Sequence, residues 1–353
     1  MPNATPARRI FYYDALRAFA IAAVIVVHVA ALDWKTTEPA SLTWQVYNVC
    51  DSLARWCVPV FVMLSGALML DPARPVTFGR LLHKNVARIA LAFVVWSAVY
   101  LVWDVARGEV GLTPGELLRA FATGHYHLWY LQMQAFLYLI VPLLRPIAQQ
   151  RRLMELMLGL SVAFCFVPNL VFMSQAVAYA FSPAYDNMAA SFVGGYVGYF
   201  VLGRYLASVE VRKPARLALY AAGLASLVFT AAGTSWLSVD AGFARGDLYG
   251  YLMPNTLLVS AALFVAVRYG LGSERAQGLA SSRLGRVLSG LSAKSFGIYL
   301  VHVLVLEALQ ALGVSPAPGG AIIGVPLMSA GTLLVSYAIV WMLGKARPLR
   351  KVL

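Results

Sequence analysis

An apolar segment near the N-terminus contains three ionisable residues whose spacing could support anion binding and proton transfer. Asp14 and Arg17 are three residues apart, so on a helix they would share one face and could form an ion pair. His28 follows Arg17 after ten residues and would lie about 16 Å further along the helix axis. Imidazole has an unperturbed pKa of about 6.5, which suits a general base near neutral pH. Structural roles stay open, because Arg17 could extend to a membrane surface while His28 hydrogen-bonds a neighbouring helix.

Charged residues also border the next two apolar segments. Asp51 and Arg55 are four residues apart and could form an ion pair, and Ser65-Gly66 would allow close helix packing. Further on, three basic residues recur every four positions and predict a basic stripe at the mouth of a helix. A stripe of this kind could bind anionic lipid headgroups or a polyphosphate ligand. The residues of the stripe are Arg80, Lys84 and Arg88.

The sequence His125-Tyr-His127-Leu-Trp129-Tyr130 opens a later apolar segment. His-x-His spacing can belong to a metal site, but no third ligand is in view, so we expect no metal. Trp129 and Tyr130 are typical of side chains at a membrane interface.

Another apolar segment, close to the C-terminus, contains Tyr299, His302 and Glu307. His302 and Glu307 are five positions apart, so the sequence does not assure a contact between them within one helix. A histidine inside an apolar span is costly and therefore indicates a partner or a function. The three cysteines have no metal-like spacing and are expected to be small core residues. They are Cys50, Cys57 and Cys165.

The composition decides which kind of protein must position these residues. The chain has 353 residues, of which 60% are hydrophobic and only 12% are charged, whereas soluble domains carry roughly 25% charged residues. This excludes an ordinary water-soluble enzyme, a disordered protein and a disulfide scaffold. The net charge of +13 does not indicate nucleic acid, because the basic residues lie between apolar stretches. We therefore expect a polytopic membrane protein with no nucleic-acid partner.

The apolar stretches predict an all-α membrane bundle of ten helices, since a helix needs roughly 20 residues to cross the hydrocarbon core. Residues 11–32 contain Asp14, Arg17 and His28, which a signal peptide would avoid, so we expect a retained first span. No loop is long enough for a soluble domain, so residues 1–353 are expected to form one membrane-embedded domain. The predicted spans are 11–32, 46–70, 86–105, 127–147, 153–173, 191–207, 217–236, 250–270, 295–312 and 321–343.

The distribution of Lys and Arg predicts the orientation of the bundle. With the N-terminus inside, 22 of the 28 Lys and Arg residues fall on the inner side and only four on the outer side. Two more, Arg17 and Arg55, lie within spans. The positive-inside rule then places both termini in the cytoplasm.

In their order along the chain, these motifs resemble those of the acyltransferase-3 family of integral-membrane O-acyltransferases. The most specific match is Asp14-x-x-Arg17 followed by ten residues and His28. The resemblance is strongest to the branch that modifies surface polysaccharides, such as enterobacterial-common-antigen O-acetyltransferase. One departure concerns the family's Arg-x-x-Arg motif, which aligns here with Asn85 and Arg88. Only the second arginine is retained, so Arg80 or Lys84 would have to supply the missing positive charge. The remaining matches are Asp51-Ser-Leu-x-Arg55 with Val58-Pro-Val-Phe-Val-Met-Leu-Ser65-Gly, His127-Leu-Trp129-Tyr-Leu with Tyr138 and Pro142, and Ser295-Phe-Gly-Ile-Tyr299-Leu-Val-His302.

The resemblance implies a cytoplasmic acyl-CoA donor, usually acetyl-CoA, and a hydroxyl of a lipid-linked or surface glycan as acceptor, in the inner membrane of a bacterium. No tightly bound cofactor is expected. The phosphates of CoA would lie among Arg17, Arg80, Lys84 and Arg88, since guanidinium groups match phosphate geometry. The pantetheine arm is an extended chain of about the ~16 Å that separates Arg17 from His28 along a helix.

His28 would then act as general base toward the acceptor, or carry the acyl group transiently. His302 and Glu307 are candidates for orienting the His28 ring or stabilising an oxyanion. Residues expected at the outer mouth, with Trp129 stacking on a sugar, are Asp51, Arg55, His127, Trp129, Tyr130 and Tyr299. A transporter of a small solute would also use buried Arg, His and Glu, and stays open as an alternative. A scaffold or glycan-binding protein without catalysis is a further alternative.

Overall fold

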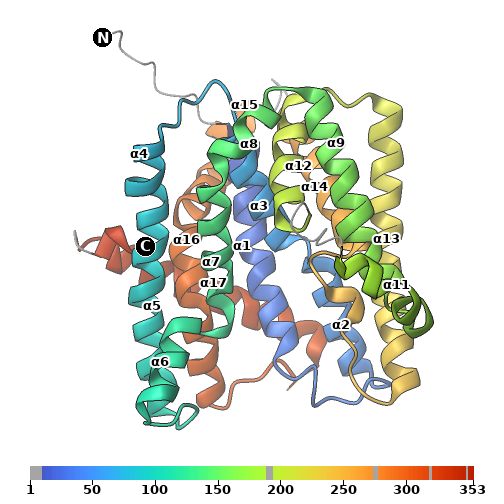
Figure 1. Cartoon of the computed structure of the whole chain (residues 1–353). Helices are drawn as coiled ribbons and strands as arrows, with labels where there is room; N and C mark the ends of the chain where they lie inside the picture. Colours follow the sequence, from blue (N-terminus) through green and yellow to red (C-terminus); the bar gives the residue numbers. More distant parts are fainter. Residues whose placement is uncertain (1–9, 188–193, 273–276, 318–319, 347–348) are drawn as a thin grey trace.

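The computed structural model describes residues 10–187, 194–272, 277–317, 320–346 and 349–353, and within these ranges the chain forms helices and no strands. The predicted all-α fold is therefore confirmed (Figure 1). In chain order the long and short helices are α1 (Phe11–Ala31), α2 (Leu42–Ala54), α3 (Cys57–Met69), α4 (Phe78–Arg80), η1 (Leu81–Val86), α5 (Ala87–Ala106), α6 (Pro114–Thr123), η2 (Tyr126–Leu128), α7 (Trp129–Leu139), α8 (Val141–Ala148), α9 (Arg151–Ser161), η3 (Val162–Phe166), α10 (Val167–Val171), α11 (Gln175–Asn187), α12 (Tyr196–Ser208), α13 (Lys213–Ala241), η5 (Asp247–Tyr249), α14 (Pro254–Leu271), α15 (Gln277–Ser281), α16 (Arg283–Ala311), α17 (Ala321–Leu343) and η7 (Leu349–Lys351).

Most of the predicted spans correspond to continuous helical segments. Among the described residues, eight segments are long and apolar enough to cross a membrane, and α7 with α8 makes a ninth if this pair, bent by 61°, is one span. The remaining predicted span, 191–207, is the sixth in the chain and corresponds to α12, which has 13 residues and begins at Tyr196. A helix of that length is shorter than the roughly 20 residues that a full crossing takes. Residues 191–193 of this predicted span lie outside the described ranges.

Several helices extend well beyond the predicted spans. The sequence predicts a span that starts at residue 295 after a loop of 271–294, but α16 begins at Arg283. Ser282 caps this helix, because its Oγ accepts a hydrogen bond from the Gly285 amide at 3.1 Å. The first turns of α16 carry charged residues, which lower the local hydropathy, yet Leu288 and Ser292 on one face are buried. A hydropathy window misses such an amphipathic extension.

Helix α1 lies at the centre of the bundle (Figure 1). It packs against α2, α3, α14, α16 and α17, and most of its residues are buried. An apolar helix that is buried on all sides is expected at the core of a large helical protein. Any ionisable side chain on α1 therefore points into the interior of the protein or along a cavity.

The tightest helix contact in the bundle joins α3 to α12 through two glycines. A Cβ on Gly66 would lie 1.8 Å from the carbonyl oxygen of Phe200, and a Cβ on Gly203 would lie 1.9 Å from that of Met63. The predicted close packing at Ser65-Gly66 is thus confirmed, with a second glycine on the opposite helix. Small residues that let two backbones approach in this way are typical of membrane helix interfaces.

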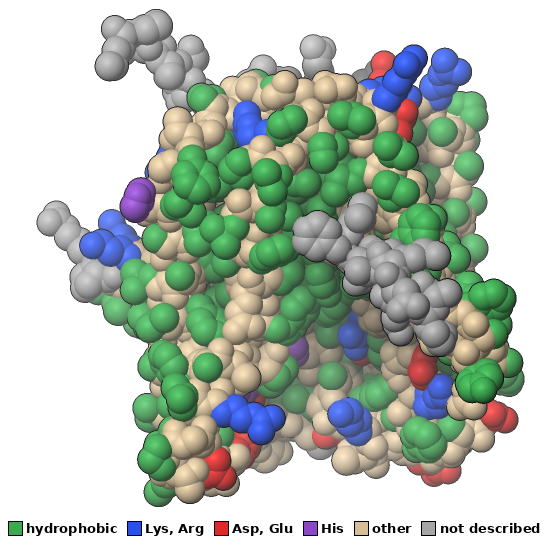
Figure 2. All heavy atoms as spheres, in the orientation of Figure 1, with side chains coloured by type: hydrophobic (Ala, Val, Ile, Leu, Met, Phe, Trp, Pro, Cys, Tyr) green, Lys and Arg blue, Asp and Glu red, His purple; other side chains and the backbone are tan. Residues whose placement is uncertain are grey.

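The outer surface suits a lipid environment. Figure 2 shows hydrophobic side chains over the middle of one face, with most charged side chains toward the two ends of the bundle. In Figure 1, α1 runs away from the end of the bundle at which the chain begins, and α2 with α3 runs back toward that end. Four of the basic residues counted for the predicted orientation lie outside the described ranges, namely Arg8, Arg9, Arg275 and Arg347.

Candidate active site

A cavity with a volume of about 460 Å³ lies inside the bundle, and both Arg17 and His28 line it. Figure 2 shows a hollow in the surface near the end of the bundle at which α1 ends, with histidine and basic side chains visible inside. The walls come from α1, α3, η1, α5, η2, α7 and α16, together with Tyr251. The lining residues are Arg17, Val24, Val27, His28, Cys57, Val58, Phe61, Ser65, Lys84, Asn85, Arg88, Ile89, Tyr126, His127, Trp129, Tyr130, Gln134, Tyr138, Tyr251, Ser292, Ala293, Ser295, Phe296 and Tyr299.

One part of the cavity wall is basic. Arg17 lies there with Lys84 and Arg88, and among the described residues none of these three forms a salt bridge with an Asp or Glu side chain. Arg88 donates a hydrogen bond to the backbone oxygen of Leu353, and its guanidinium carbon lies 5.1 Å from the centre of the Phe296 ring. Three cations without Asp or Glu partners among the described residues create a positive potential that favours an anionic ligand.

Two residues predicted beside this basic wall do not line the cavity. Asp14 is buried and faces α16, where it accepts a hydrogen bond from the Ser292 hydroxyl at 2.8 Å. Arg80 is exposed in α4. Of the two residues that could replace the missing family arginine, Lys84 therefore lines the cavity and Arg80 does not.

His28 lies in the last turn of α1 between two aromatic neighbours. Its Nδ1 is 3.4 Å from the Tyr126 hydroxyl, and the centre of its ring is 5.0 Å from that of His302. His302 is fully buried behind His28, does not line the cavity, and holds its Nδ1 2.7 Å from the Tyr299 carbonyl. Because a carbonyl only accepts, that Nδ1 carries the proton.

His127 is the second histidine of the cavity wall and is also buried. Its Nδ1 lies 3.1 Å from Nδ1 of His125, while its backbone oxygen accepts a hydrogen bond from the Tyr299 hydroxyl. The Nε2 atom of His127 is buried without a hydrogen-bond partner among the described residues. A buried polar atom of this kind costs free energy unless a ligand or water satisfies it, which is expected of a functional site.

Aromatic rings form the wall next to the two histidines. Trp129 stacks on Tyr251, with ring centres 6.0 Å apart and planes inclined by 27°, and also contacts Tyr196 at 5.5 Å. The Tyr130 hydroxyl donates a hydrogen bond to Gln134 at 3.0 Å. Flat rings on one side of a polar cavity suit a ligand that presents both an apolar face and hydroxyl groups.

Asp51 and Arg55 form an ion pair, as their spacing predicts, but they stand behind the cavity wall. The Arg55 guanidinium lies 4.4 Å from the centre of the Tyr249 ring and 5.9 Å from that of Tyr251. Only Tyr251 of this group lines the cavity. The ion pair therefore supports an aromatic wall residue from behind.

Glu307 lies apart from His28. Its Oε1 is 3.2 Å from His125 Nε2, and its Oε2 accepts hydrogen bonds from Trp103 and Arg107. Glu307 contacts His125 and does not line the cavity. In the sequence, the one signal at His125 is its His-x-His spacing to His127, which does not indicate a contact with Glu307.

The structure adds several cavity residues that sequence reasoning did not assign a role. Tyr126 contacts His28, Tyr251 stacks on Trp129, and Asn85 lines the cavity together with Lys84 and Arg88. The position of Tyr126 between His125 and His127 was a usable signal, because both neighbours are polar residues in an apolar chain. Tyr251 follows a short polar loop and has no comparable signal in the sequence.

The chain also matches a protein-family model. A family model described as "Acyltransferase domain" matches residues 10–341, which is nearly the whole chain. No curated protein and no solved structure matches the chain.

Proposed function

The chain belongs to the acyltransferase-3 family, and from that premise we propose that it transfers an acyl group from acyl-CoA to a hydroxyl of a glycan. The proposed donor is cytoplasmic acetyl-CoA, and the proposed acceptor is a surface or lipid-linked glycan at a bacterial inner membrane. Membership of the family makes the chain a multi-pass membrane acyltransferase in general. Acetyl-CoA as the donor and a glycan as the acceptor are what the proposal adds to the family assignment.

The observation that carries the proposal is that one cavity contains Arg17, Lys84, Arg88 and His28. Arg17, Lys84 and Arg88 suit the phosphates of CoA, because charge-assisted hydrogen bonds to phosphate are short and strong. Along α1, His28 lies about 16 Å from Arg17, which is about the reach of an extended pantetheine arm. With both termini in the cytoplasm, the basic wall would face the cytoplasm, where CoA is found.

His28 is the proposed general base. With Nδ1–H donating to the Tyr126 oxygen, Nε2 keeps the lone pair that accepts the hydroxyl proton. The acceptor oxygen then attacks the thioester carbon, the new C–O bond forms, and the C–S bond breaks. The sulfur of CoA leaves with the proton that His28 has taken up. An acyl-histidine intermediate would use the same atom as nucleophile.

His302 is the proposed positioning residue for His28. Its ring packs against that of His28, and its own orientation is held by the Tyr299 carbonyl. His302 does not line the cavity, so the structure favours a role in orienting His28 over direct contact with an oxyanion. His127 does line the cavity, and its Nε2 has no hydrogen-bond partner among the described residues, so His127 is the proposed residue for the oxyanion role.

The aromatic wall is the proposed acceptor site. Trp129 would stack on a sugar ring, while Tyr130, Tyr299 and His127 would contact its hydroxyl groups. Asp51 and Arg55 would act from behind by fixing Tyr251. A surface polysaccharide as acceptor accords with the resemblance to the enterobacterial-common-antigen branch.

The deciding experiment measures thiol release from acetyl-CoA by the full-length chain reconstituted in proteoliposomes. Thiol release that requires an added glycan fraction, and an acetyl mass gain on that glycan, would support the proposal. A small-solute transporter would instead move solute across the membrane without consuming CoA thioester, which would overturn it. Mass spectrometry of surface glycans from cells with and without the gene identifies the acceptor.

A further inference from the structure

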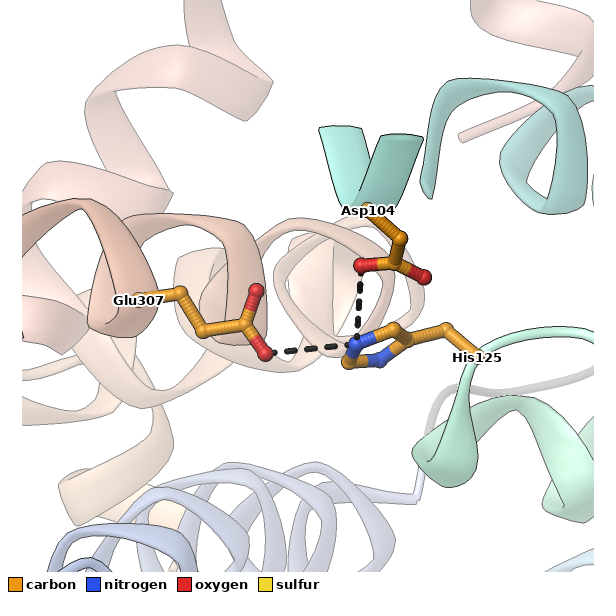
Figure 3. Close-up of side chains that lie close together, drawn as sticks. All are labelled: Asp104, His125 and Glu307. Carbon is orange, nitrogen blue, oxygen red and sulfur yellow. Dashed lines mark ion pairs between the residues drawn. The ribbon is translucent and has the colours of Figure 1, made fainter. Parts of the chain in front are cut away.

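Asp104, His125 and Glu307 converge from three separate parts of the chain. Asp104 lies near the end of α5, Glu307 near the end of α16, and His125 directly before η2. Figure 3 shows the three side chains pointing toward one another. One possible ligand atom from each residue lies within 4.8 Å of the other two. None of the three lines the acyl-transfer cavity, so they form a separate cluster.

The distances within this cluster fit the coordination sphere of a metal ion. His125 Nε2 is 3.2 Å from Glu307 Oε1 and 3.7 Å from Asp104 Oδ1. A tetrahedral ion with bonds of about 2.1 Å holds its ligand atoms roughly 3.4 Å apart. A hydrogen bond accounts for the shorter contact, but 3.7 Å is too long for one.

The remaining polar atoms of two ligands are already engaged by other residues. Glu307 Oε2 accepts hydrogen bonds from Trp103 Nε1 at 2.8 Å and Arg107 Nη1 at 3.2 Å. His125 Nδ1 faces His127 Nδ1 at 3.1 Å. Outer partners that orient a ligand in this way are typical of metal sites.

The ring of His125 and the carboxylate of Asp104 are also suitably placed. Tyr100 stacks on the His125 ring with centres 4.5 Å apart and planes inclined by 20°, which fixes the ring plane. Asp104 Oδ1 is buried and has no hydrogen-bond partner among the described residues. One atom of each ligand is thus left directed at the same point.

The carboxylates around the cluster outnumber the Lys and Arg side chains that pair with them. Asp104 and Glu307 have side chains only 13% exposed, and Glu109 brings a third carboxylate through its ion pair with Arg107. Arg107 is the single Lys or Arg that forms an ion pair with these carboxylates in the described part of the chain. Because the Glu109 side chain is 47% exposed, the partly buried charges are those of Asp104, Glu307 and Arg107, which leave one net negative charge if His125 is neutral. Partly buried charge without a counter-charge is costly, and one divalent cation would compensate it.

We propose that Asp104, His125 and Glu307 bind one divalent cation, with Zn²⁺ as the best match to one imidazole nitrogen and two carboxylate oxygens. This set differs from a His125-x-His127 site, because the other ligands come from α5 and α16. The ion ties the segment before α7 to those two helices. That segment carries Tyr126 and His127, so the ion positions two residues of the cavity wall. The metal site does not depend on the identity of the donor or acceptor.

The test counts Zn²⁺ bound to the full-length chain, purified in detergent, stripped with a chelator and then reloaded with Zn²⁺. Elemental analysis after desalting is expected to find one Zn²⁺ per chain. Competition with a chromophoric chelator measures the affinity for Zn²⁺. Asp104→Asn should weaken Zn²⁺ binding more than about 100-fold, which exceeds the loss expected when a hydrogen-bond partner of a ligand is removed. Asp240→Asn, a carboxylate on α13 outside the cluster, is the matched control and should bind as the wild type does.

A second variant removes a hydrogen bond to the ligand Glu307 without removing the ligand itself. Trp103→Phe keeps the ring but deletes the N–H that donates to Glu307, so Zn²⁺ binding should weaken about 10- to 100-fold. Wild type without stoichiometric Zn²⁺ would overturn the proposal. Unchanged affinity in both Asp104→Asn and Trp103→Phe would also overturn it, because the ion would then lie elsewhere.

X-ray absorption spectroscopy of the Zn²⁺-loaded wild type identifies the ligand atoms directly, so this test does not depend on whether a variant folds. The expected spectrum contains one imidazole nitrogen with oxygen ligands. Two imidazoles would favour the His125–His127 pair, and sulfur would indicate a cysteine. Either result would contradict the proposed ligand set.

Discussion

Arg17 and His28 line the same cavity although they are eleven positions apart along α1. Eleven residues make about three turns of an α-helix, so the two side chains project from the same face about 16 Å apart. The helix is continuous between them and lies at the centre of the bundle. A single rigid element therefore sets the distance between the proposed phosphate-binding end of the site and the proposed base.

His28→Ala should abolish most acyl transfer, because loss of a general base typically costs about 10²- to 10⁴-fold in rate. The measurement is thiol release from acetyl-CoA in the presence of the glycan fraction, at equal amounts of folded protein. His83→Ala is the matched control, since His83 is exposed in η1 and does not line the cavity. Wild-type rates in His28→Ala would exclude His28 as the base or the acyl carrier.

Arg17→Ala should weaken CoA binding about 10- to 100-fold, because a hydrogen bond to a charged group contributes about 1.5–3 kcal/mol. Calorimetric titration with CoA measures the effect, and added salt should weaken binding to the wild type more than to the variant. Arg80→Ala serves as control, because Arg80 is exposed outside the cavity. Equal losses in Arg17→Ala and Arg80→Ala would argue against phosphate binding inside the cavity.

Trp129→Ala should lower glycan acetylation about 3- to 10-fold without changing CoA affinity, because stacking on a flat ring contributes about 0.5–1.5 kcal/mol. The two quantities are the acetyl content of surface glycans and the Kd for CoA. Trp236→Ala on α13, where the side chain is 68% exposed, should change neither. If Trp129→Ala weakened CoA binding instead, the aromatic wall would belong to the donor site.

Gly203→Ala should destabilise the protein by about 1–3 kcal/mol, since the new Cβ would meet the backbone of Met63 and cannot be relieved by a side-chain movement. Thermal unfolding in detergent should show a lower Tm. Gly331→Ala in α17 is the control, because a Cβ there meets nothing within 4 Å. An unchanged Tm in Gly203→Ala would mean that α3 and α12 can separate without cost.

Features of the site that depend on spacing within one helix could be predicted from the sequence, whereas contacts between distant segments could not. The Asp51–Arg55 ion pair follows from a spacing of four residues on one helix. The basic stripe shows the limit of the same argument. Leu81–Val86 forms the wider turns of a π-helix, which shift the angular positions of residues on either side. Lys84 and Arg88 consequently line the cavity, while Arg80 does not.

Contacts between distant segments were beyond sequence reasoning. Glu307 was expected near His28 because both are ionisable groups in apolar spans, yet it contacts His125 and Trp103. In a chain that is apolar nearly throughout, hydropathy does not indicate which helix faces meet. The cluster of Asp104, His125 and Glu307 could not be predicted for the same reason, since Asp104 and Glu307 are separated by about 200 residues in the chain.

The sequence by itself determined that this protein is a helical membrane bundle of the acyltransferase-3 type, with Arg17 and His28 about three turns apart on one helix. Those properties depend on composition and on spacing within one element. Only the tertiary structure decided that His28 packs against His302, that Tyr126 contacts its ring, and that His125 meets two carboxylates. These contacts depend on how the helices pack, and the close approach of small residues such as Gly66 and Gly203 sets that packing in three dimensions.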